Sequence, residues 1–179
     1  MSPAPLQQAS PLANPQQPAD LLLYRLAKLS ASSGRLVTRL CERQYGVTRR
    51  EWGMLMWLAQ EPGLQPSVLA ERLELDRARV SRAIASLQDK GLLQKSPMAA
   101  NRSGSALHLT ALGQQLHDAL WPQIHAINVR LLDALKPESI TELDLSLAAL
   151  QQQAQRLDLQ SESAEHFPPR RAGSRRSSP

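Results

Sequence analysis

The chain has 179 residues, of which 42% are hydrophobic and 21% charged, with a formal net charge of +5 and a pI near 10.0. That length favours one domain with appendages, and the positive charge favours a polyanionic partner, either nucleic acid or an acidic membrane surface. Aromatic residues make up only 3%, which argues against a protein that stacks single-stranded bases. The single cysteine excludes an internal disulfide and suits a reducing cytoplasm.

Both ends of the chain have the composition of disordered segments. Residues 1–19 are rich in Pro, Gln and Ala, and residues 161–179 are polar and carry two arginine pairs near their end. Those arginines either add non-specific phosphate contacts or only keep the tail solvated. No signal peptide and no apolar run long enough to span a membrane is present, so we expect a cytoplasmic protein.

A first long helix is predicted from Asp20, as its N-cap, to about Gln44. Its middle is a run of small residues, 30–34, which includes Ser33. This run is interpreted as a crossing point in a dimer or as the wall of a ligand cavity. The alternative is a helix that merely tolerates small residues at some cost in helix propensity. Near the helix end, Cys41 is either a small apolar filler or an oxidant sensor. Arg39 and Arg43 would lower the pKa of its thiol if they face it.

The second helix begins with a capping box, because Thr48 is followed by Glu51 at the required spacing. Trp52 and the leucines that follow it at helical spacing are expected to face the core. A glycine inside this helix, Gly53, costs stability and would open room for a flat ligand beside Trp52, Met56 or Trp57. The alternative is that these large side chains are ordinary core.

A short helix, a tight turn and a basic helix follow in residues 64–91. Ser67 lies in the first turn of the short helix, where it would touch a phosphate. Asp76 is placed to cap the basic helix, and Gly91 is placed to end it. The basic helix carries four polar side chains near its start: Arg77, Arg79, Ser81 and Arg82. A helix fits the major groove, and arginine grips guanine or phosphate with its planar fork.

Two short runs, 92–95 and 106–109, are predicted as a two-stranded wing. The tip between them is polar and carries Arg102, which would enter the neighbouring minor groove. Helix, turn, recognition helix and wing together predict a winged helix-turn-helix that binds double-stranded DNA.

Two further helices are predicted after the wing. The first is capped by Thr110 and runs to about Leu135, with His117, Trp121 and His125 on one face. This face is interpreted as the border of a cavity or of a partner subunit, because the ligand set of a metal site is missing. The second helix starts at Pro137. The leucines of the first and last helices would be buried best against a copy of the chain, which predicts a homodimer.

Residues 20–159 resemble the MarR family of winged helix-turn-helix transcription regulators. The matching motifs are VTRREWGMLMWLAQEPG (Val47–Gly63), LAERLELDRARVSRAIASLQDKGLL (Leu69–Leu93) and LHLTALG (Leu107–Gly113). The resemblance implies a homodimer, joined through its first and last helices, that binds a pseudo-palindromic operator. It also implies release by a small ligand bound between the dimer interface and the DNA-binding lobe. At the wing tip the family's Asp-x-Arg would place its arginine at Ser103, whereas this chain has Arg102, one position earlier.

The predicted architecture is mainly α, with a two-stranded β wing and a helical dimerisation region formed by the N- and C-terminal helices. A MarR-type domain spans 20–160. Its winged helix-turn-helix lobe is 47–110, and its dimerisation helices are 20–46 and 111–160. Segments 1–19 and 161–179 are predicted to be disordered.

The predicted function is that of a sequence-specific transcriptional regulator, a homodimeric repressor released from its operator by a small aromatic ligand of the carboxylate type. The alternatives are an oxidant-sensing regulator that uses Cys41 and a winged-helix protein-interaction module that binds no DNA. No phosphate loop, nucleophile elbow or metal-ligand spacing supports an enzyme, and no cofactor is expected. The DNA-binding candidates are Ser67, Arg77, Arg79, Ser81, Arg82 and Arg102. The ligand-binding candidates are Ser33, Trp52, Met56, His117 and Trp121.

Overall fold

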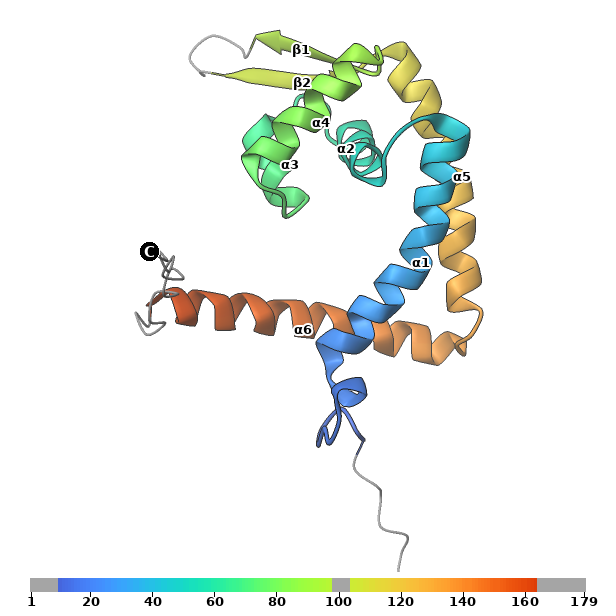
Figure 1. Ribbon diagram of the computed structural model, residues 1–179, viewed down its shortest axis with the longest axis vertical. Coiled ribbons are helices and arrows are strands. Elements are labelled where there is room, and N and C mark those ends of the chain that lie inside the picture. Colours follow the sequence, from blue (N-terminus) through green and yellow to red (C-terminus); the bar gives the residue numbers. More distant parts are fainter. Residues whose placement is uncertain (1–9, 98–103, 164–179) are drawn as a thin grey trace, which may run out of the picture. The chain divides into compact units, whose positions relative to one another are not determined.

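The structure, a computed structural model, describes residues 10–97 and 104–163 (Figure 1). The chain divides into two compact units, residues 1–131 and 132–179. The first unit contains a short 3-10 helix η1 (Pro18–Asp20), α1 (Leu22–Tyr45), α2 (Arg49–Gln60), α3 (Pro66–Arg72), α4 (Arg77–Asp89), β1 (Leu93–Pro97), β2 (Ser105–Leu109) and α5 (Ala111–Leu132), whose last residue lies at the boundary. The second unit contains α6 (Pro137–Ser163). The prediction of a mainly helical winged fold is confirmed.

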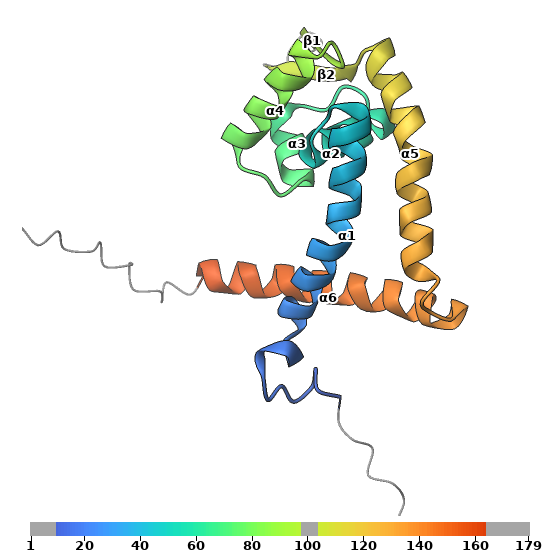
Figure 2. The same ribbon diagram turned by 45° about the vertical axis from the view of Figure 1, so that its right-hand side comes forward.

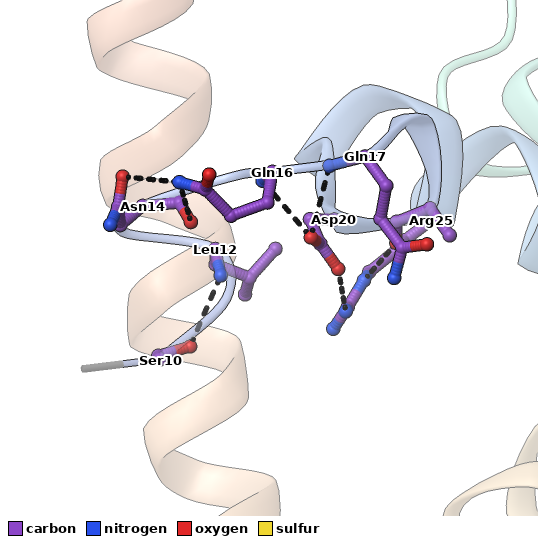
Figure 3. A network of polar contacts seen from close by, with 8 residues as sticks. Ser10, Leu12, Asn14, Gln16, Gln17, Asp20 and Arg25 are labelled. Atoms are coloured by element: carbon purple, nitrogen blue, oxygen red, sulfur yellow. Dashed lines mark hydrogen bonds and ion pairs between the residues drawn. The ribbon is translucent and has the colours of Figure 1, made fainter. Parts of the chain in front are cut away.

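The N-terminal segment differs from its prediction as a disordered tail. Residues 10–20 form a turn followed by η1, stabilised by a polar network (Figure 3). The Asp20 carboxylate accepts hydrogen bonds from the backbone N–H groups of Gln16 and Gln17, at 3.1 and 3.3 Å. It also pairs with Arg25 at 3.5 Å. These contacts, the Gln16 hydrogen bond above all, lower the pKa of Asp20. Residues 1–9 lie outside the described part.

The prediction that Asp20 caps the first long helix is therefore wrong. Its carboxylate is already occupied by the loop that precedes it, and the N-cap of α1 is Leu21, which makes no side-chain capping bond. The helix instead begins after η1, where the backbone at Leu21 is extended.

The core of the first unit lies between α2, α4 and the hairpin. In both views α3, α4 and the hairpin gather around α2 (Figures 1 and 2). The Thr48 capping box is confirmed: Thr48 Oγ1 accepts from the Glu51 N–H at 3.2 Å, and Glu51 accepts from the Thr48 N–H at 2.6 Å. Beyond the predicted Trp52, Leu55 and Leu58, Met54 is also completely buried.

The wing is an antiparallel hairpin in which Leu93 pairs with Leu109 and Pro97 with Ser105. It is attached to the loop before α3, because Leu107 donates to the Leu64 carbonyl at 3.0 Å and accepts from Gly63 at 2.9 Å. Its root is therefore held by two hydrogen bonds besides its own ladder. The predicted wing-tip residue Arg102 lies outside the described residues.

The start of α5 is fastened to the end of α4 through Thr110. Its hydroxyl donates to the Gly91 carbonyl at 2.6 Å and accepts from the Gly113 N–H at 3.0 Å, which confirms Thr110 as the cap. A Cβ at Gly113 would strike the carbonyl oxygen of Leu92, so only glycine allows this approach. Further along α5, the Tyr45 hydroxyl of α1 donates to the Ala119 carbonyl at 3.3 Å.

Large apolar side chains remain exposed on the long helices. On α1 they include Leu23, Leu26, Leu29 and Leu36, and on α6 they are Leu143, Leu145, Leu147, Leu150, Leu157 and Leu159. The last helix, α6, extends to Ser163, whereas the sequence predicted that a disordered tail starts at residue 161. Residues 164–179 lie outside the described part. Within the described ranges, no helix is both long and apolar enough to cross a membrane.

Candidate nucleic-acid interface and ligand pocket

The basic helix α4 begins and ends where its residues require. The Asp76 carboxylate accepts from the Arg79 N–H at 2.8 Å, and this hydrogen bond, with the neighbouring arginine charges, lowers the pKa of Asp76. At the other end, Gly91 takes a left-handed conformation with φ of 68°. Both predicted boundaries of the helix are confirmed.

The two faces of α4 have opposite character. Val80, Ala83, Ile84 and Leu87 are buried in the core. The candidate DNA-binding residues of the helix are all exposed: Arg77, Arg79, Ser81 and Arg82. The helix therefore presents a cationic face to solvent and is held by its apolar face.

A groove of about 430 Å³ runs between the start of α3, α4 and the wing. It brings together three predicted residues, Ser67, Arg77 and Ser81. It adds Lys95 of β1, which the sequence reasoning missed. The available signal was its charge: Lys95 is a cation in the run predicted as the first wing strand. It lies two residues after the buried Leu93, on the same face of the hairpin but farther toward the tip, where it is exposed.

Arg79 differs from its neighbours because it is already paired. Its Nε lies 3.0 Å from Asp76 Oδ2, and both side chains are 54% exposed. Neither Arg79 nor Arg82 lines the groove. Arg82 makes no ion pair within the described residues, so its guanidinium is available to a partner.

A second cavity of about 640 Å³ lies among α1, α2, the turn before α4, and α5. Its lining residues are Val37, Arg49, Arg50, Trp52, Gly53, Met56, Leu73, Leu75 and Ile124. Two ligand candidates, Trp52 and Met56, therefore line the same pocket, beside Gly53; that they bind a ligand stays a prediction.

The other three ligand candidates lie outside this lining. Ser33 donates its hydroxyl hydrogen to the Leu29 carbonyl of its own helix at 2.9 Å. His117 stacks between Trp52 and Trp121, with ring centroids 5.5 and 6.0 Å apart. His117 also lies 3.0 Å from Asp118, and this hydrogen bond lowers the pKa of Asp118. The Trp52 ring thus belongs both to the pocket and to a three-ring stack on α5.

Comparison with known proteins gives the family. The model of the MarR family matches residues 45–100. A protein of Thauera aromatica, whose name assigns it provisionally to transcriptional regulation of the hcr operon, is 30% identical over 120 residues, which cover 65% of this chain and 72% of that protein. The chain belongs to the MarR family. It is a transcriptional regulator with a winged helix-turn-helix, not an enzyme.

Two solved MarR-family structures are similar over nearly their whole length. PcaV of Streptomyces coelicolor, solved with its natural ligand, has a TM-score of 0.63 and is 25% identical, over 82% of this chain and 98% of that chain. MepR of S. aureus, solved with DNA, has a TM-score of 0.70 and is 19% identical, over 77% of this chain and 99% of that chain. The structural similarity to MepR confirms the fold.

In this MarR-family chain, Cys41 is placed as a core residue. It is completely buried, and burial raises the pKa of its thiol to about 11. The condition that Arg39 and Arg43 face the thiol is not met: the cation that acts on it is Arg49, and burial outweighs that charge. This environment disfavours an oxidant-sensing thiolate. The described residues hold no cluster of three or more His, Cys, Asp or Glu that could bind a metal.

Proposed function

We propose that this MarR-family regulator is a homodimeric repressor that binds a pseudo-palindromic double-stranded operator and is released by a small aromatic carboxylate. The observation that carries the proposal is the exposed cationic face of a capped α4, set beside a groove that also holds Ser67 and Lys95.

Recognition of DNA by this face follows from its chemistry. A helix fits the major groove, and arginine binds guanine or phosphate with two parallel hydrogen bonds. Arg77 and Arg82 carry this role, with Ser67 and Lys95 contacting the backbone on either side. Arg79 can join Arg77 and Arg82 in binding DNA only after its ion pair with Asp76 is broken. The DNA complex of MepR supports this choice of partner.

The dimer is supported by the apolar side chains that a single chain leaves in water. Leu23 and Leu145, for example, are 78% and 66% exposed. Burying such residues against a second copy is favourable. A twofold dimer then presents two copies of α4 to half-sites about one DNA turn apart, which explains a pseudo-palindromic operator.

The pocket of Trp52 and Met56 supports the ligand class. It combines a flat indole and apolar walls with two guanidinium groups, Arg49 and Arg50. An aromatic ring with an anionic substituent matches both features. Since the pocket is lined from α1, α2 and α5, an occupant that fits only one arrangement of these helices would shift the population away from the DNA-binding state. The ligand complex of PcaV supports a small-molecule partner.

The experiment is a gel-shift titration with the operator selected from genomic DNA by the protein itself. We expect Arg82→Ala to weaken specific binding about 5- to 150-fold, because one arginine contact to a base is lost. Arg43→Ala, an exposed arginine at the end of α1, is the matched control and leaves the affinity unchanged. Equal affinities of the Arg82→Ala and wild-type proteins would refute the assignment of α4.

Two further measurements test the rest of the proposal. Affinity for duplex DNA should fall steeply with salt, whereas a protein-interaction module would show no such dependence. Light scattering after size exclusion should give the mass of two chains. A monomer that ignores duplex DNA at low salt would refute the whole proposal.

A further inference from the structure

We infer that Arg49 binds the carboxylate of the effector and that Gly34 of α1 is the positioning residue that holds Arg49 in place. The inference rests on the proposed function, since it concerns the ligand of the same pocket. It adds which of two adjacent arginines acts and why a glycine stands in the middle of a long helix.

The first step is the contact between Gly34 and Arg49. Gly34 is one of the two buried residues of α1. A Cβ built on it would collide with Nη1 of Arg49 and would lie 3.2 Å from Cζ and 3.8 Å from Nη2. The guanidinium group of Arg49 therefore lies against the helix exactly where a side chain is missing. Any larger residue at position 34 displaces it.

The second step concerns charge. None of the ion pairs formed by the described residues uses Arg49 or Arg50. No carboxylate lines the cavity, whose other walls are apolar side chains and one glycine. Arg49 is thus an exposed cation, in none of these ion pairs, at the edge of a largely apolar pocket. A planar guanidinium group in this setting favours a carboxylate, which it can bind with two hydrogen bonds.

The third step separates Arg49 from Arg50. Both follow Thr48 in the first turn of α2 and both line the cavity. Only Arg49 is shown against a second element, because its guanidinium group packs on α1 at Gly34. Fixing a side chain in advance reduces the entropy lost on binding. The carboxylate of the ligand is therefore expected on the α1 side of the cavity, with its ring toward Trp52, Met56 and Gly53.

The test compares benzoate with benzamide, which has the same shape but no charge, by calorimetry on the full-length protein. We expect wild-type protein to prefer benzoate by about tenfold or more, because a charge-assisted hydrogen bond is stronger than a neutral one. Arg49→Gln should abolish the preference. Gly34→Ala, which improves helix propensity and leaves Arg49 intact, should reduce it by a similar factor.

Two controls make the result specific. Arg50→Gln removes the same charge from the same pocket, and Ser30→Ala changes an exposed small residue of the same helix. Ser30→Ala should keep the preference for benzoate, and Arg50→Gln should reduce it less than Arg49→Gln does. A preference that disappears in Arg50→Gln but persists in Arg49→Gln would overturn the inference. So would an unchanged preference in Gly34→Ala, or none in the wild type.

Failure of the proposed function is read separately, in a DNA-release assay with the same compounds. The inference is supported if only Arg49→Gln and Gly34→Ala lose the preference for benzoate. This holds even if benzoate does not release the protein from its operator. In that case the proposal of ligand-induced release fails and the assignment of Arg49 stands.

Discussion

Lys90 Nζ lies 2.8 Å from Oε2 of Glu51, whose side chain is only 3% exposed. The same ammonium group donates to the Gly46 carbonyl at 2.9 Å. Glu51 lies in the first turn of α2, Lys90 follows the last residue of α4, and Gly46 caps the end of α1. The ends of α1, α2 and α4 therefore meet at one ion pair, which ties the C-terminal end of α4 to the other two helices.

Removing the cation should destabilise the lobe. In Lys90→Met the carboxylate of Glu51 stays buried but loses its strongest donor, so we expect the free energy of unfolding to fall by about 1–3 kcal/mol. Urea denaturation measures this change. Lys136→Met, at an exposed lysine between α5 and α6, is the control and should lie within about 0.5 kcal/mol of wild type. Equal stabilities of the two variants would contradict the structural role of the pair.

The same carboxylate predicts a dependence on pH. Burial by itself raises the pKa of Glu51, but hydrogen bonds from Lys90 and Ser86 outweigh it, so the pKa lies below its ordinary value of 4.5. A group with a lowered pKa in the folded state stabilises the fold above its unfolded pKa, and this stabilisation is lost as the pH falls through the folded pKa. Wild-type protein should therefore lose more stability below about pH 4.5 than Glu51→Gln does. If the stability of both proteins falls in parallel with pH, the lowered pKa of Glu51 is contradicted.

The stack of Trp52, His117 and Trp121 should be visible in tryptophan fluorescence. His117→Ala removes two ring contacts, each worth about 0.5–1.5 kcal/mol, and opens Trp52 to water. We expect an emission maximum at longer wavelength and a lower free energy of unfolding. His125→Ala, two helical turns away and exposed, is the matched control and should leave the spectrum unchanged. An unaltered spectrum in His117→Ala would mean that the stack does not form in solution.

Two glycines should respond differently to alanine. Gly113→Ala would place its Cβ against the backbone carbonyl of Leu92, which cannot move cheaply, so we expect a loss of about 1–3 kcal/mol. Gly53→Ala would meet only the end of the Leu73 side chain, at 3.0 Å. There the gain in helix propensity of about 1 kcal/mol offsets the contact. Thermal unfolding of both variants should rank Gly113→Ala far below Gly53→Ala, and the opposite order would refute this account.

The burial of Cys41 predicts an unreactive thiol. With a pKa near 11, the thiolate is scarce at neutral pH, and the sulfur is out of contact with solvent. A disulfide reagent should therefore label Cys41 only after denaturation. Cys41→Ser should lose about 1–3 kcal/mol of stability through its buried hydroxyl, while peroxide leaves operator binding unchanged in both proteins. Rapid labelling of the native protein would revive the oxidant-sensing alternative.

The winged helix-turn-helix could be predicted from sequence because its signals are local. Asp76 and Gly91 delimit α4 by their own side-chain and backbone chemistry, and Thr48 with Glu51 starts α2 in the same way. The predictions that failed depend on what surrounds a residue. Asp20 has the composition of an N-cap, but the loop before it supplies better donors than the helix that follows.

The pocket was predictable only in part for the same reason. Trp52, Met56 and Gly53 lie on one helix, so their spacing placed them together. The role of Gly34 depends on Arg49, fifteen positions later in the chain and on another helix, and no periodicity connects the two. Ser33, its neighbour, was selected from the same run of small residues but uses its hydroxyl within α1.

The hydroxyl of Thr110 bonds at once to the last turn around α4 and to the first turn of α5. Gly113 also packs closely against the Leu92 carbonyl, so three contacts restrain the angle between α4 and α5 at this junction. The winged helix-turn-helix lobe and the first turns of α5 are consequently expected to move as one rigid unit. In the proposed dimer, a change in the distance between the two DNA-binding lobes is therefore expected to arise farther along α5, beyond this junction.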